Sequence, residues 1–185
     1  MINTQPAVNP QVQLVLEEVK KRSVKNLFFV ACGGSLAVMH PNKYFLDREA
    51  DQVTSDFYNA SEFITRSPRT LTDASVVILL SLTGTTPETT EAAVFAKSKG
   101  ALTVGVTCDI ESPLAKAVDH AVIYDNAFAG VPIEVLNGNF SVMYQLGAGI
   151  IDAVEGKDVL PRLVSRLVEA AAGDRPSQGA VRGLL

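Results

Sequence analysis

Hydroxyl side chains gather in one short stretch of the chain, which reads Ser-Leu-Thr-Gly-Thr-Thr. The stretch follows the apolar run Val76–Leu80 and precedes Pro87, which suits the first helical position because its missing N–H needs no partner there. The first N–H groups of a helix lack internal acceptors and carry the positive end of the helix dipole, so this turn is suited to binding an anion. Its candidate ligand residues are Ser81, Thr83, Gly84, Thr85 and Thr86.

The alternative is that these hydroxyls only cap the following helix. Thr86 is placed as the N-cap before Pro87, and Thr85 with Glu88 also fits a capping box. A cap accounts for one or two hydroxyls and leaves the others, with Gly84, for a ligand. The stretch between Arg69 and Lys97 has no basic residue and no Walker-type pattern, so hydroxyls, amides and the helix dipole would hold the anion.

The elements that position this turn follow from the spacing of apolar residues. Strands are expected over 27–31, 52–57, 76–80, 101–107 and 121–124. Helices are expected over 11–24, 60–64, 87–96, 112–118, 134–154 and 158–172, and a further helix runs from the turn at 33–35 to about residue 50. Gly100 is expected to stop the helix over 87–96. This alternation predicts an α/β fold with a parallel sheet covered on both faces. Ligands of such sheets bind at the carboxyl ends of the strands, where three turns (33–35, 81–86 and 107–112) would meet.

Composition limits the class of protein. The chain has 185 residues, 47% hydrophobic and 19% charged, with a net charge of −4. This fits one globular domain, expected over 10–172, with a lead-in at 1–9 and a tail or linker at 173–185. The acidic balance argues against nucleic acid, no apolar run is long enough for a membrane, and the start shows no secretory signal pattern. We therefore expect a cytoplasmic protein, in keeping with only two cysteines.

Three stretches in order resemble the SIS (sugar isomerase) family over about residues 10–155. They are Cys32-Gly33-Gly34-Ser35, Ala60-Ser61-Glu62-Phe63 and the turn from Ser81 to Thr86, which fits the family loop S-x-S-G-x-T with Thr83 in place of the second serine. The resemblance implies a flavodoxin-like three-layer α/β/α sandwich with a five-stranded parallel sheet that binds phosphosugars. The residues expected to contact sugar or phosphate are Gly34, Ser35, Ser81, Thr83, Gly84, Thr85, Thr86 and Ser112.

Within the family, the sequences V-A-C-G-G-S and T-P-E-T resemble the corresponding sequences of deglycases that cleave 6-phosphorylated fructosamines. Leu82 and Thr85 stand where the loop of glucosamine-6-phosphate synthase has Gln and Glu, which separates this chain from that activity. The resemblance therefore implies cleavage to glucose 6-phosphate and an amine, without a cofactor. A phosphosugar-sensing domain without catalysis and an aldose–ketose isomerase remain the alternatives.

The resemblance also implies a second unit. The deglycases carry two SIS domains in tandem, and their acid and base, a Glu and a His, come largely from the second. This sequence stops at Leu185, about where a second domain would begin. It is read as a fragment, a truncated form, or a single-SIS protein that forms a homo-oligomer, a dimer or larger.

Few side chains in this chain suit acid–base work. Glu62 and Glu134 are the candidates, because Glu62 matches a family position and Glu134 follows a loop where some members place an acid. His40 and His120 are interpreted as structural or exposed. The two cysteines, Cys32 and Cys108, are interpreted as packing residues at strand ends. No spacing of His, Cys and acids suggests a metal site.

Overall fold

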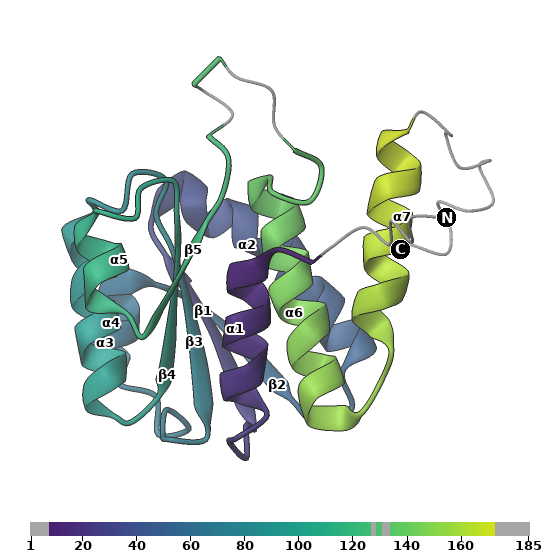
Figure 1. Ribbon diagram of the computed structural model, residues 1–185. Helices are drawn as coiled ribbons and strands as arrows, with labels where there is room; N and C mark the ends of the chain where they lie inside the picture. Colours follow the sequence, from purple (N-terminus) through teal and green to yellow (C-terminus); the bar gives the residue numbers. More distant parts are fainter. Residues whose placement is uncertain (1–7, 127–128, 131–133, 173–185) are drawn as a thin grey trace.

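A computed structural model describes residues 8–126, 129–130 and 134–172 (Figure 1). Its strands are β1 (Asn26–Ala31), β2 (Thr54–Asn59), β3 (Ser75–Leu80), β4 (Leu102–Thr107) and β5 (His120–Ile123). Its helices are α1 (Pro10–Val19), α2 (Gly33–Glu49), α3 (Ala60–Arg66), α4 (Pro87–Ser98), α5 (Pro113–Ala117), α6 (Asn139–Glu155) and α7 (Val159–Ala171).

The strands form one sheet in the order β2-β1-β3-β4-β5, and every neighbouring pair is parallel. This confirms the expected flavodoxin-like order, in which β1 has β2 on one side and β3 on the other. Ala31 pairs with Leu80 in the β1–β3 register, so these two strands end level with each other. The turns that follow them therefore leave the sheet side by side, at the point where the strand order reverses.

Two apolar clusters, one on each face, hold the three layers together. Along β1, Leu27 and Phe29 point to the face covered by α1, α2 and α6, while Phe28 and Val30 point to the face covered by α3, α4 and α5. Figure 1 shows these helices on opposite sides of the sheet, with α7 outside α6. Because successive side chains of a strand alternate between faces, a continuous apolar run serves both clusters.

Strand β2 begins two residues later than the sequence predicts. The Glu155 carboxylate accepts the backbone N–H groups of Asp51, Gln52 and Val53, with Oε1 at 2.8 Å from the nitrogen of Gln52. These groups are bound to the end of α6 and are not available to the sheet. The strand therefore starts at Thr54, and it is an edge strand with a largely polar sequence.

Helix α6 begins at Asn139, five residues after the predicted start at Glu134. The intervening residues form a turn in which the backbone nitrogen of Asn137 donates to the oxygen of Glu134 at 2.9 Å. Asp125 holds this turn, since its carboxylate accepts the backbone N–H of Glu134 and the side-chain amide of Asn137. Tertiary hydrogen bonds thus replace the first helical turn that periodicity predicts.

Helix α1 ends at Val19, before the predicted limit at Val24. The last bonds run from Lys21 to Glu18 and from Arg22 to Val19, which is the tighter i→i+3 pattern that often closes a helix. Helix α2, in contrast, continues through Pro41 and ends at Glu49, close to the predicted limit at about 50.

The division into a lead-in, a domain over 10–172 and a tail stays a prediction, because residues 1–7 and 173–185 lie outside the described residues. Among the helices of the described segments, none is both long and apolar enough to cross a membrane.

The carboxylate of Glu155 makes the clearest pH-dependent contribution to stability. Its side chain is 1% exposed, and Lys157 Nζ lies 2.8 Å from Oε2. Burial by itself would raise the pKa of Glu155, but Lys157 and the three N–H groups outweigh it and lower the pKa from 4.5 to about 2. The ionised form is therefore favoured by the folded state.

We predict that Glu155→Gln lowers the free energy of unfolding at pH 7 by about 2 kcal/mol. Because the folded-state pKa is depressed, the stabilisation is complete above pH 4.5 and is lost as the pH falls toward 2. Urea unfolding at a series of pH values should show the two proteins converging in this window. Glu111→Gln, which removes an exposed ion pair with Lys116, serves as the control and should cost less than about 1 kcal/mol. A pH-independent difference would contradict the assignment.

Candidate functional site

The turn after β3 carries a bonded set of hydroxyls. Ser81 is buried, and its Oγ lies 3.0 Å from Oγ1 of Thr86, so the first and last hydroxyls of the turn are joined. Thr83 and Thr85 are exposed, and their Oγ1 atoms lie 2.7 Å apart. The turn therefore presents neutral donors and acceptors at the carboxyl edge of the sheet.

Helix α4 begins where this turn ends, and no side chain caps it. Thr86 is the N-cap residue and Pro87 follows it, but the Thr86 hydroxyl bonds to Ser81 and makes no cap bond to the helix. The helices α1, α3 and α5, in contrast, are capped by Asn9, Asn59 and Ser112. The positive end of the α4 dipole is therefore left for an anion.

A second helix start lies beside the first. Helix α2 begins at Gly33, directly after β1, and its N-cap residue Cys32 also makes no side-chain cap bond. A methyl group built on Gly33 or Gly34 would meet no atom within 4 Å, so the backbone here is open. Thr89 of α4 donates from Oγ1 to the Cys32 sulfur at 3.9 Å, which ties the two helix starts together. Ser35 lies in the first turn of α2 and is half-buried.

The connection from β4 to α5 fixes the conformation of the turn from Ser81 to Thr86, which we call the hydroxyl turn. The backbone oxygen of Leu82 accepts the N–H of Cys108 at 2.9 Å and the hydroxyl of Thr107 at 3.2 Å. The oxygen of Gly84 accepts the N–H of Leu114 at 3.0 Å. These bonds bind the turn to the neighbouring strand, so its hydroxyls are positioned before any ligand arrives.

Ser112 was expected among the ligand residues, and the structure shows what its side chain does. It is 2% exposed, and its Oγ accepts the N–H of Ala115 at 3.2 Å. It also packs under Gly84, where an added Cβ would lie 2.2 Å from Ser112 Oγ. Its observed role is to cap α5 and support the turn, and a direct contact with a ligand stays a prediction.

The two candidate acids differ in their surroundings. Glu62 lies in the first turn of α3, and its carboxylate is 3.3 Å from Nη1 of Arg66. Glu134 is exposed in the turn before α6, where its backbone N–H donates to Asp125 and its backbone oxygen accepts the N–H of Asn137. Neither side chain is bonded to the hydroxyl turn, so their catalytic roles stay predictions.

A polar network that sequence reasoning missed supports the turn of Glu134. Asn137 donates from Nδ2 to Asp125 Oδ1 at 2.7 Å and accepts the side-chain amide of Asn9, also at 2.7 Å. Gln145, fully buried, accepts the backbone N–H of Asn9 at 2.8 Å and donates to the oxygen of Leu136. An aspartate directly after β5 was the available signal, but its partners are far away in sequence.

The side chains of Cys108, His40 and His120 are not part of the hydroxyl turn. Burial raises the pKa of the Cys108 thiol, which bonds to the Tyr124 hydroxyl, so Cys108 is kept neutral. His40 is exposed on α2 with its ring edge-on to Phe57, and His120 opens β5 at the opposite edge of the sheet. Within the described segments, no group of three or more His, Cys, Asp or Glu could hold a metal.

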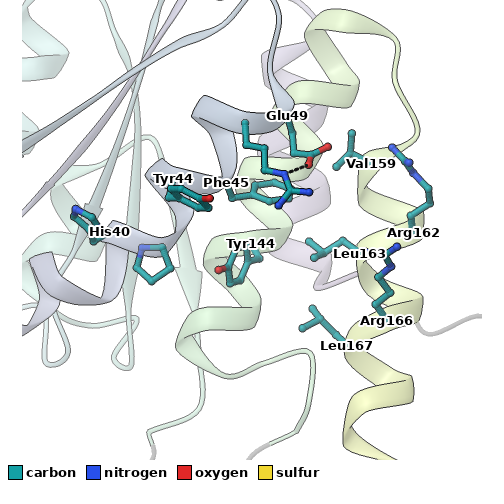
Figure 2. Close-up of a pocket in the computed structure, with 12 residues that line it drawn as sticks. His40, Tyr44, Phe45, Glu49, Tyr144, Val159, Arg162, Leu163, Arg166 and Leu167 are labelled. Atoms are coloured by element: carbon teal, nitrogen blue, oxygen red, sulfur yellow. Dashed lines mark ion pairs between the residues drawn. The ribbon is translucent and has the colours of Figure 1, made fainter. Parts of the chain in front are cut away.

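A pocket of about 640 Å³ lies elsewhere, between α2, α6 and α7 (Figure 2). It includes none of the residues of the hydroxyl turn. The candidate anion site is therefore suggested by the hydroxyls at the starts of α2 and α4 and not by the size of a cavity; these helix starts lack a side-chain cap, as those of α6 and α7 also do.

The sheet order defines a flavodoxin-like domain, with the two turns lying at its switch point. Residues 20–142 match the model of the SIS domain, and the chain belongs to that family. It is an SIS domain of the phosphosugar isomerase and deglycase type.

Known relatives support this family assignment. The fructosamine deglycase FrlB of Bacillus subtilis is 42% identical over 165 residues, which are 89% of this chain and 49% of the relative. The fructoselysine 6-phosphate deglycase of Escherichia coli is 34% identical over 116 residues, 62% of this chain and 34% of the relative. A crystal structure from Bacillus subtilis, of a protein proposed to be a phosphosugar isomerase, superposes with a TM-score of 0.86 and 41% identity over 93% of this chain and 52% of that chain. The matched residues thus span about half the length of FrlB and of the crystal structure, and about a third of the Escherichia coli relative.

We predict that Gly84→Ala distorts the turn. The glycine has φ +66°, and an added Cβ would overlap Ser112 and lie 2.9 Å from Thr107 Oγ1. Gly156 has φ +68° with open space around it, so Gly156→Ala carries the backbone strain alone, about 1 kcal/mol. Gly84→Ala should cost at least about 1 kcal/mol more in chemical unfolding. Equal losses of unfolding free energy in the two variants would show that the turn accommodates the added methyl group at no extra cost and would contradict the prediction.

Proposed function

We propose that this chain is the phosphosugar-binding unit of a deglycase that cleaves a fructosamine 6-phosphate to glucose 6-phosphate and an amine. The observation that carries the proposal is the pair of helix starts, α2 and α4, which both lack a side-chain cap and are linked by the Thr89–Cys32 contact, next to the bonded hydroxyls of Ser81 and Thr86. The names of the relatives above, a fructosamine deglycase and a fructoselysine 6-phosphate deglycase, support this choice of substrate class.

In this proposal the phosphate accepts hydrogen bonds from the hydroxyls of Ser81, Thr83, Thr85 and Thr86. The N–H groups at the start of α4 add partial positive charge, and the Gly34 backbone with the Ser35 hydroxyl contacts the substrate from the other turn. Since the hydroxyl turn contains no cation, the phosphate is recognised by directed hydrogen bonds and dipoles.

Anchoring the phosphate fixes the position of C1 and C2 of the open-chain sugar. Cleavage requires a base to remove a proton from C1 and an acid to protonate the C2 carbonyl oxygen, which gives an enaminol. Protonation of C2 and loss of the N–H proton then give an imine at C1. One water then hydrolyses the imine to glucose 6-phosphate and the free amine. Glu134, exposed in the turn before α6, and Glu62 are the acids that this chain can offer.

We further propose that the complete site needs a second unit, either another SIS domain or another subunit. The support is that this chain spans 49% of FrlB and 52% of the similar crystal structure. Both described cysteines, Cys32 and Cys108, are free thiols, which fits the reducing cytoplasm as the compartment.

We predict that the Ser81→Ala, Thr86→Ala double variant binds glucose 6-phosphate and fructoselysine 6-phosphate at least about 10-fold more weakly than the wild type, measured by isothermal titration calorimetry. The loss of two hydrogen bonds to a charged group is the reason. Thr65→Ala with Ser98→Ala is the control, because these exposed hydroxyls bond only to their own helices.

Unchanged affinity of the Ser81→Ala, Thr86→Ala double variant for both sugar phosphates would contradict the proposal that this turn binds the phosphate. Product assays then separate the candidate activities. Release of amine from fructoselysine 6-phosphate supports the deglycase, and interconversion of glucose and fructose 6-phosphates supports an isomerase. Tight binding without turnover, also in the presence of a second unit, supports a sensor.

A further inference from the structure

The turn that carries Glu134 is held by a polar network from three elements of the fold. The Asp125 carboxylate, directly after β5, accepts the backbone N–H of Glu134 at 3.0 Å and the side-chain amide of Asn137 at 2.7 Å. Asn137 in turn accepts the side-chain amide of Asn9, the N-cap residue of α1, at 2.7 Å. The buried Gln145 of α6 links the backbone N–H of Asn9 to a backbone oxygen of the turn. The backbone of the turn is therefore fixed from β5, α1 and α6.

The carboxylate of Glu134 takes no part in this network. Its side chain is exposed, and of the described residues none forms an ion pair or a hydrogen bond with the carboxylate. Glu62, the other candidate acid, instead lies 3.3 Å from Nη1 of Arg66. A network that fixes the backbone beneath an unpaired carboxylate suits a group that must meet a ligand at a defined position. Of the two candidate acids, Glu134 is therefore the one prepared for a cationic ligand group.

The hydroxyl turn and the turn of Glu134 are separated by two strand spacings along the carboxyl edge of the sheet. The hydroxyl turn follows β3, Thr107 ends β4 with its hydroxyl on the oxygen of Leu82, and Asp125 follows β5. Two strand spacings measure about 10 Å. An open-chain fructosamine 6-phosphate has eight bonds between phosphorus and nitrogen, which span about 10 Å when extended. A phosphate bound at the hydroxyl turn therefore leaves the amine end of the ligand within reach of the turn of Glu134.

We propose that the Glu134 carboxylate binds the ammonium group of the substrate, and that Asp125 and Asn137 are positioning residues that hold it there. An aliphatic amine is largely cationic near pH 7, whereas a ketose phosphate has a neutral hydroxyl at the same carbon. The carboxylate therefore selects a fructosamine phosphate over the corresponding ketose phosphate. C1 is one bond from this nitrogen, so the same carboxylate lies beside the carbon from which the proposed reaction removes a proton. The inference rests on the proposed function for the phosphate end of the ligand.

The first test compares two ligands that differ only at C1, fructosamine 6-phosphate with an amine and fructose 6-phosphate with a hydroxyl. Their affinities are measured by isothermal titration calorimetry on the full chain. The wild type should bind the amine at least about 5-fold more tightly, because one charge-assisted hydrogen bond is added. Glu134→Gln should bring the two affinities to about the same value. Glu91→Gln, which removes an exposed carboxylate from α4, is the control and should keep the preference for the amine.

The second test addresses the positioning residues. Asp125→Asn and Asn137→Ala should each lower the ratio of the two affinities at least about 2-fold, because the turn loses a hydrogen bond that fixes Glu134. The matched control is Asn26→Ala, which removes an amide that bonds to the oxygen of Thr70 near the amino ends of the strands, and it should keep the ratio. Thermal unfolding verifies that each variant is folded. A general loss of structure would weaken the binding of both ligands alike, so the ratio reports on position alone.

The outcomes separate this inference from the proposed function. Equal affinity of the wild type for the two ligands, or a preference that Glu134→Gln retains, overturns the inference and leaves the phosphate site standing. A preference that depends on Glu134 but persists in the Asp125→Asn and Asn137→Ala variants overturns the role of the positioning residues. A wild-type chain that binds neither ligand contradicts the proposed function and overturns this inference with it.

Discussion

The parallel pairing of β1 with β3 is the constraint on which the site depends. Ala31 and Leu80 are partners in the register, so both strands end at the same level and their turns leave the sheet together. Two helix N-termini with unsatisfied N–H groups are thereby brought to one place, which repulsion between their dipoles alone would disfavour. The Thr89 hydroxyl on the Cys32 sulfur links the two helix starts, and the Ser81–Thr86 bond fixes the turn before α4.

The hydroxyl turn is preorganised by its neighbours and not by its own residues alone. The carbonyl oxygens of Leu82 and Gly84 are bound by the β4–α5 connection, and Ser112 fills the space that Gly84 leaves by having no side chain. A rigid set of neutral donors loses little conformational entropy on binding and discriminates by geometry. This suits a substrate whose phosphate must be held while bonds change several atoms away.

Helix α2 connects the candidate anion site with the pocket between α2, α6 and α7. Its first turn carries Gly34 and Ser35, and its second half presents Tyr44 and Arg48 to the pocket.

The sequence by itself determined what depends on near neighbours. The order of strands and helices follows from short apolar runs, and the hydroxyl turn with its following helix is recognisable because Ser81 through Pro87 are contiguous. The flavodoxin-like fold and the family were predicted correctly on these local patterns.

Only the tertiary structure decided the features that need partners from distant parts of the chain. Glu155 sets where β2 begins, and Asp125 delays the start of α6, because backbone N–H groups bind whichever acceptor the fold brings to them. Ser112 has the residue type of a ligand, yet its hydroxyl serves α5. The pocket between α2, α6 and α7 joins residues more than a hundred positions apart, so only the tertiary structure shows which side chains line it.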